Sequence, residues 1–203
     1  MKLGNKTLRQ CHKKNPYFSK YNTFIIKIIF VVLIIAVCSD KSYAQQKNFS
    51  YFKLSILNDN DKILLVKYKG IWELPGKKYI DTRSLKQFTG HMAKELGVEF
   101  DEFRLRGLFT FFYNDAKYPI LFNYYSGLYK SGDLEVPPGC IDIAWFSLEE
   151  ALKVIPFETM RLILRKMFEE KSYVWGASMH IQKSSELAVD KVTINEDFYP
   201  LSK

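Results

Sequence analysis

The sequence WELPGKKYIDTRSLKQFTGHMAKELGV, residues 72–98, joins an extended segment to a helix. The Pro-Gly pair at 75–76 ends the extended part, because these two residues favour turns over regular structure. Ser84, followed three residues later by Gln87, forms a capping-box pattern that predicts the start of a helix. Four apolar residues then recur at helical spacing and should share one buried face: Leu85, Phe88, Met92 and Leu96. We therefore expect a helix over 84–96.

The same stretch resembles the Nudix box, written G-x5-E-x7-R-E-U-x-E-E-x-G-U with U aliphatic and usually preceded by W-x-L-P-G. The span 76–98 has the 23 residues that the box requires, and five of nine specified positions match. The matching residues are Gly76, Met92, Glu95, Gly97 and Val98. The resemblance implies an α/β fold, a Nudix-like α/β/α sandwich around a mixed β-sheet. In that family the precedent is cleavage of nucleoside diphosphates linked to another moiety.

The positions that depart from the box are the charged ones. Where the box has Glu, Arg, Glu and Glu, this chain has Thr82, Gly90, His91 and Lys94. Family members use Mg²⁺, a hard ion that takes oxygen ligands, to activate water on the pyrophosphate. Positions 91, 94 and 95 are spaced i, i+3 and i+4 on a helix, so their side chains should converge on one site. Lys94 would then place an ammonium where the metal belongs.

The resemblance therefore implies a degenerate catalytic site at His91, Lys94 and Glu95, with Glu95 as the one candidate metal ligand. We expect no cofactor, and weak or no Mg²⁺-dependent hydrolysis. The expected role is that of a ligand-binding or interaction domain, and the expected partner is a nucleotide-like or other phosphorylated small molecule. Lys94 would pair with its anionic group. Aromatic strand residues are candidates to stack on its ring: Tyr124, Tyr125, Phe111 and Tyr113.

Two alternatives remain open at this stage. The first is an active, Mg²⁺-dependent Nudix hydrolase whose metal ligands have moved, with Glu95 joined by acids from outside the box: Glu73, Asp81, Asp133 or Glu135. The second is an interaction module of the cell envelope with a vestigial pocket. Mg²⁺ binding distinguishes the degenerate site from an active hydrolase, because a site with one carboxylate should hold Mg²⁺ weakly.

The flanking sequence alternates strand-like and helix-like runs, which is typical of an α/β domain. Ser147 and Glu150 form a second capping-box pattern, and Pro156 separates that helix from another over 157–168. The expected strands span 51–57, 62–68, 71–74, 103–113, 120–129, 141–146, 174–182 and 192–198. The last two predict a hairpin that closes the sheet, so 45–203 forms one domain with a C-terminal β extension.

Residues 1–44 have the pattern of a secretory signal peptide. A lysine-rich start precedes the apolar run FIIKIIFVVLIIAV at 24–37, and Ser42-Tyr43-Ala44 offers a cleavage site. We expect cleavage after Ala44 and an exported, periplasmic or cell-envelope protein. An uncleaved inner-membrane anchor through 24–37 and lipidation at Cys38 are the alternatives.

The leader also explains the basic pI of about 9.2. Residues 1–44 carry eight basic and one acidic residue, whereas 45–203 carry 22 basic and 21 acidic residues. The near-neutral mature part gives no reason to expect a nucleic-acid partner. Cys140 is the only cysteine after the leader, so no internal disulfide is expected there.

Overall fold

The computed structural model describes residues 50–80, 82–185 and 191–203. Nine strands and three helices lie in these ranges. The strands are β1 (Ser50–Leu57), β2 (Ile63–Tyr68), β3 (Ile71–Glu73), β4 (Gly76–Tyr79), β5 (Glu99–Tyr113), β6 (Ile120–Ser131), β7 (Cys140–Phe146), β8 (Val174–Gln182) and β9 (Lys191–Ser202). The helices are α2 (Leu85–Glu95), α3 (Leu148–Val154) and α4 (Glu158–Glu169). The predicted signal segment, 1–44, lies outside the described residues.

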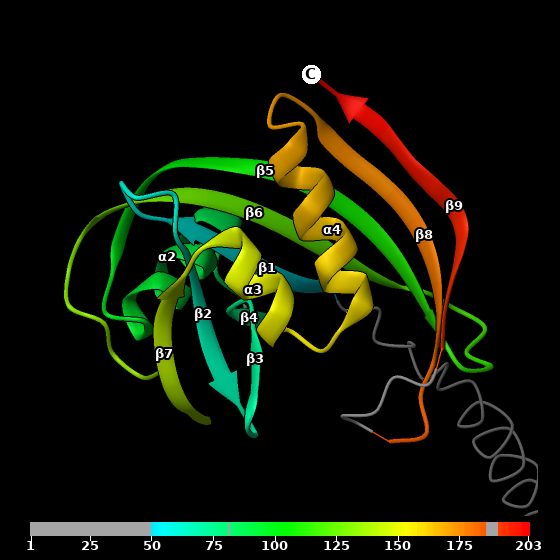
Figure 1. The fold of residues 1–203 in the computed structure, drawn as a ribbon, viewed down its shortest axis with the longest axis horizontal. Coiled ribbons are helices and arrows are strands. Elements are labelled where there is room, and N and C mark those ends of the chain that lie inside the picture. Colours follow the sequence, from blue (N-terminus) through cyan, green and yellow to red (C-terminus); the bar gives the residue numbers. More distant parts are fainter. Residues whose placement is uncertain (1–49, 81, 186–190) are drawn as a thin grey trace, which may run out of the picture. The chain divides into compact units, whose positions relative to one another are not determined.

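The strands form one mixed sheet in the order β3-β2-β1-β6-β5-β8-β9, while β4 also pairs with β1 and β7 with β2 (Figure 1). The pairs β1–β6 and β5–β8 are parallel, and the other strand pairs are antiparallel. Strand β1 is central and buried along most of its length. Nearly continuous burial is expected where both faces of a strand are covered.

Two separate apolar cores show that helices cover both faces of the sheet. On one face, α2 contributes Phe88, Met92 and Leu96 against Leu54 and Ile56 of β1. On the other face, α3 and α4 pack on a second cluster, which includes Leu74, Phe109, Phe122, Ile163 and Leu164 (Figure 1). The α/β/α arrangement around a mixed sheet agrees with the fold class expected from sequence.

Helix α2 begins as its sequence predicts. Ser84 is the N-cap, and both hydrogen bonds of the capping box with Gln87 are present. The helix ends at Leu96, and Gly97 follows with a φ of +74°, where a side chain would overlap the backbone oxygen of Asp133. Three of the four predicted apolar residues are buried, but Leu85 is only partly buried because it lies in the first turn, at the edge of the core.

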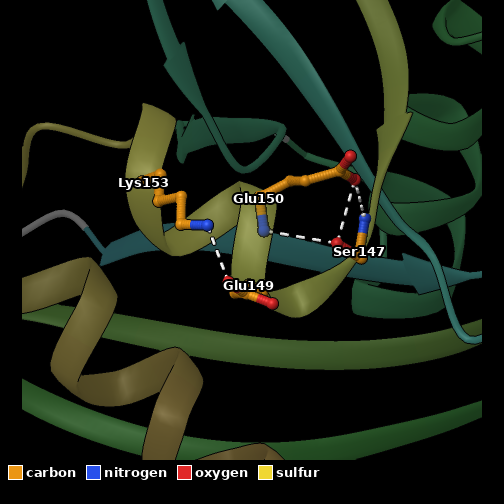
Figure 2. A network of polar contacts seen from close by, with 4 residues as sticks. All are labelled: Ser147, Glu149, Glu150 and Lys153. Carbon is orange, nitrogen blue, oxygen red and sulfur yellow. Dashed lines mark hydrogen bonds and ion pairs between the residues drawn. The ribbon is translucent and has the colours of Figure 1, made fainter.

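Helix α3 also starts at a predicted capping box (Figure 2). The hydroxyl of Ser147 accepts a hydrogen bond from the backbone N–H of Glu150, and the Glu150 carboxylate accepts one from the backbone N–H of Ser147 at 2.8 Å. The Ser147 backbone bond, and after it the hydroxyl bond, lowers the pKa of Glu150. Glu149, also in the first turn, pairs with Lys153 one turn further along the helix at 2.6 Å.

The W-x-L-P-G run, residues 72–76, packs against both β7 and α4. Trp72 packs edge-on against Phe146 of β7, with ring centroids 4.9 Å apart. Leu74 is fully buried, and its backbone N–H donates to the sulfur of Met160 on α4. These contacts give the motif a structural role in holding β3 and α4 together.

The strand predictions differ from the structure mainly at strand ends. Strand β5 starts at Glu99 and not at 103, β9 runs on to Ser202, and β4 was not expected at all. The predicted C-terminal pair is confirmed, because β8 and β9 are antiparallel neighbours. Within the described ranges, no helix is long and apolar enough to cross a membrane.

Candidate functional site

A cleft of about 530 Å³ opens on the face of the sheet that carries α3 and α4. Its walls come from β1, from the end of β2, from the β3–β4 connection, from the facing ends of β5 and β6, from the end of β8 and from the start of α4. Side chains that give it polar and aromatic character are Tyr51, Lys53, Tyr68, Glu73, Lys77, Lys78, Tyr113, Phe157 and Lys183. Among the described residues, the lining therefore holds four lysines and one carboxylate.

Lys53 forms the floor of this cleft. It is 7% exposed, and its ammonium lies 2.6 Å from a carboxylate oxygen of Glu73 and 3.2 Å from the backbone oxygen of Leu74. Strand β1 places Lys53 opposite Gly76 of β4. A Cβ at Gly76 would lie 2.5 Å from Cδ of Lys53, so the box glycine provides the space that the lysine stem occupies.

Lys77 and Glu95 form the second ion pair of the site. Lys77 reaches from β4 to α2, where its ammonium contacts both carboxylate oxygens of Glu95. His91, one turn earlier on α2, lies with Nε2 at 3.3 Å from the same carboxylate. A smaller cavity of about 110 Å³ contains Glu95 and shares Glu73, Gly76 and Lys77 with the main cleft. The two cavities are thus neighbouring parts of one charged site.

The residues present do not fit the Mg²⁺ site that the Nudix resemblance implies. Both carboxylates at the site, Glu73 and Glu95, are already paired with lysines. Asp133 and Glu135 are exposed, with Glu135 lining a different groove, and Asp81 lies outside the described residues. Nowhere in the described part of the chain do three His, Cys, Asp or Glu side chains gather as metal ligands would. We therefore derive no catalytic step through a metal.

Lys94 does not join His91 and Glu95. Its side chain is exposed and lines a separate groove of about 1010 Å³ on the outer side of α2, with Gly90, Gly97 and Glu135. Neighbouring helical residues are about 100° apart around the helix axis. His91 and Glu95, four residues apart, therefore point in similar directions, whereas Lys94 points about 100° away from Glu95. The cation beside Glu95 is therefore Lys77.

The two tyrosines predicted to bind ligand lie on opposite faces of the sheet. Tyr124 lines the cleft but is 1% exposed, and burial raises its pKa far above the ordinary tyrosine value, with smaller effects from Tyr113 and Glu73. Tyr125 points to the α2 side, where Phe52 and Phe103 stack on its ring at centroid distances of 5.7 and 4.5 Å. Tyr125 therefore packs among aromatic side chains of the α2-side core and does not line the cleft.

The remaining aromatic candidates, Phe111 and Tyr113, both lie on the α3–α4 side of the sheet, and Tyr113 is the one that lines the cleft. Phe111 is buried and stacks on Phe122 at 4.5 Å, so it belongs to the core. Tyr113 lines the cleft, and burial followed by the nearby Tyr51 raises its pKa. Tyr113 is thus the aromatic candidate that reaches the cleft without being fully enclosed.

Sequence reasoning missed the cleft lysines. Lys53 interrupts an otherwise apolar strand, YFKLSIL, and a lysine in such a run is normally assigned to a solvent-facing side. Lys77 follows the box glycine at a position where the box specifies no residue type. For Lys53, the signal that could have been used is Glu73 in the adjacent extended segment, since a buried lysine needs a carboxylate partner. No comparable signal marks Lys77, which is partly exposed.

Comparisons with known proteins place the fold. No family model matches the chain, and no curated protein matches its sequence. Among solved structures, the mutator MutT protein of Bacillus halodurans matches with a TM-score of 0.56 and 14% identity, over 72% of this chain and 97% of that one. A Nudix hydrolase of Nitrosomonas europaea matches with a TM-score of 0.53 and 19% identity, over 68% and 81%.

A third match is the Nudix domain of Shewanella oneidensis NrtR, crystallised with ADP ribose. Its TM-score is 0.52 at 20% identity, over 64% of this chain and 94% of that one. Together with the α/β/α layers and the position of α2, these likenesses show that the chain has a Nudix-like fold.

Proposed function

We propose that the cleft binds a phosphorylated small molecule that carries a ring, and that it does so with little or no Mg²⁺-dependent hydrolysis. The observation that carries this proposal is the pairing of Glu95, the remaining box carboxylate, with Lys77. A carboxylate that already holds an ammonium is a poor ligand for Mg²⁺, which needs several oxygen ligands. The protein is then a ligand-binding or interaction domain on a hydrolase-type scaffold.

The charge of the cleft favours an anion. Among the described residues, its lining includes four lysines and Glu73, and Glu95 at its border pairs with Lys77, so lysines outnumber carboxylates at the site by two. Hydrogen bonds from ammonium groups to phosphate are charge-assisted and stronger than neutral ones. The aromatic rings of Tyr51, Tyr68 and Phe157 supply flat, apolar walls next to these charges. A few polar groups among aromatic walls are typical of small-molecule sites, and one fold neighbour was crystallised with such a ligand, ADP ribose.

An active Nudix hydrolase with relocated ligands is the second candidate. It is favoured by one observation, that Glu73 and Glu95 both border the smaller cavity. Two carboxylates there become available to a metal if a bound substrate draws Lys53 and Lys77 away. This reading requires Mg²⁺ for turnover, which separates it from the first.

A thermal-shift screen of the purified protein tests the proposal. The probes are ADP, ADP-ribose, a sugar nucleotide and inorganic phosphate, each with EDTA, Mg²⁺ or Mn²⁺. We expect nucleotides to raise the melting temperature in the wild type, and Lys77→Ala to reduce the shift. Lys94→Ala is the matched control, because it also removes a lysine near Glu95, but Lys94 lines a different groove. The absence of any shift, or a loss with Lys94→Ala alone, would contradict the assignment of the cleft.

We further propose that the protein is exported and that its mature form begins near Gln45. The support is the order of basic region, apolar run and small-residue cleavage site in residues 1–44. N-terminal sequencing of protein from the envelope fraction tests this proposal. A chain that keeps Met1 and needs detergent for extraction would favour a membrane anchor.

A further inference from the structure

We propose that Lys77 acts as a built-in cation in place of a metal ion, so that the site takes its ligand as the metal-free anion and Mg²⁺ opposes binding. This inference rests on the proposed function and specifies the charge form of its ligand. It reverses the expectation for a metal-dependent site, in which Mg²⁺ brings the phosphates to the protein.

The position of Lys77 makes it suitable for this role. Its side chain is 41% exposed and borders both the main cleft and the smaller cavity. Strand β4 pairs with β1 and fixes the Lys77 backbone opposite Phe52, while Glu95 fixes the ammonium from the α2 side. An ammonium has three N–H donors. Glu95 supplies two oxygens, so at least one donor of Lys77 remains for a ligand oxygen.

The neighbouring charges give Mg²⁺ no favourable place. Glu73 is 2.6 Å from the ammonium of Lys53, and Glu95 is held by Lys77 and faced by His91. An incoming Mg²⁺ would therefore have to displace an ammonium or lie within a few ångströms of one. Unlike charges attract and like charges repel most strongly in such partly buried sites, where water screens them less.

Mg²⁺ bound to the ligand should also weaken its binding to the protein. A diphosphate that has chelated Mg²⁺ carries less negative charge and offers fewer oxygens to the protein. The ammonium of Lys77 then gains less from binding it than from binding the free anion. Excess Mg²⁺ should thus lower the apparent affinity by removing the form of the ligand that the site prefers.

Calorimetric titration of the full-length protein with ADP, in EDTA and in millimolar Mg²⁺, tests this inference. We expect tighter binding in EDTA. An increase in affinity with Mg²⁺ would overturn the inference while leaving the binding of phosphorylated ligands intact. No binding of ADP in either buffer would instead count against the proposed function, and the inference would fall with it.

Variants at the ion pair sharpen the test. Lys77→Gln removes the cation and frees Glu95, so metal-free affinity should fall by about tenfold or more, the effect of one charge-assisted hydrogen bond. Glu95→Gln leaves the cation in place and removes its competing partner, so metal-free affinity should be kept or increased. Lys94→Gln is the control and should bind as the wild type does. Metal-free binding by Lys77→Gln as tight as that of the wild type would overturn the inference.

Discussion

Gly76 and Lys53 illustrate how single residues define the cleft. The buried ammonium of Lys53 is held by Glu73 and by the backbone oxygen of Leu74, so its stem cannot move away without breaking these bonds. A buried lysine without its carboxylate would carry an unpaired charge, which is costly. The glycine of the box is therefore needed here for packing against Lys53, whatever chemistry the site performs.

The first prediction compares Gly76, the glycine that the box specifies, with Gly90, which stands where the box has arginine. Gly76→Ala should destabilise the fold by about 1–3 kcal/mol, because its Cβ overlaps Lys53 and overpacking in tight sites costs this much. Gly90→Ala should stabilise it by about 0.5–1 kcal/mol, since Gly90 lies inside α2 with open space around it and alanine favours helix. Urea unfolding of both variants measures the two effects. Equal stability changes of the same sign would contradict the packing described for Lys53.

At the scale of elements, local signals were the most informative part of the sequence. Both capping boxes predicted helix starts that the structure has, because the bonds within a capping box involve residues close in sequence. Strand β4 was missed because its pairing with β1 depends on contacts distant in sequence and its residues, GKKY, show no alternation. Strand ends were also less predictable, since a partner strand extends them beyond the apolar pattern.

The candidate site was predictable only in part, for the same reason. The box located α2 and Glu95, but the register that brings Lys53 to Gly76 is set by the sheet. Helical spacing predicted that His91 and Glu95 would meet, and they do. It did not determine which side of α2 faces the smaller cavity, which Glu95 lines and Lys94 does not.

The second prediction concerns the buried face of α2. Met92 is 3% exposed within the core, whereas Leu85 is partly buried. Met92→Ala should therefore cost about 2–5 kcal/mol of folding free energy. Leu85→Ala should cost less, because part of its surface is already in water. The denaturation midpoints of the two variants measure these costs. A larger loss of stability for Leu85→Ala than for Met92→Ala would show that α2 is rotated relative to the sheet.

At the scale of the whole molecule, the buried cleft wall links stability to pH. Burial raises the pKa values of Tyr113 and Tyr124, so the native state keeps phenol protons that the unfolded chain releases at high pH. The stability that these neutral phenols contribute is fully present below the ordinary tyrosine pKa of about 10 and is lost as pH rises above it.

The third prediction follows from this linkage. The melting temperature should fall as the pH rises above about 10, the ordinary tyrosine pKa. Lysines also titrate in this range, so the informative comparison is with Tyr124→Phe, which cannot ionise at this position. The variant should lose less stability than the wild type over the same range. Identical pH dependence in the two proteins would show that the Tyr124 phenol does not contribute.

The central claim is that Lys77 has taken the place of a metal beside Glu95, and a hydrolysis assay tests it most directly. The full-length protein, with millimolar Mg²⁺ and either ADP-ribose or nucleoside triphosphates, should show turnover no faster than background. Restoring the box with Thr82→Glu, His91→Glu and Lys94→Glu should increase Mg²⁺ affinity only slightly while Lys77 still holds Glu95. Robust wild-type turnover that is abolished by Glu95→Gln would contradict the claim and establish a metal-dependent hydrolase.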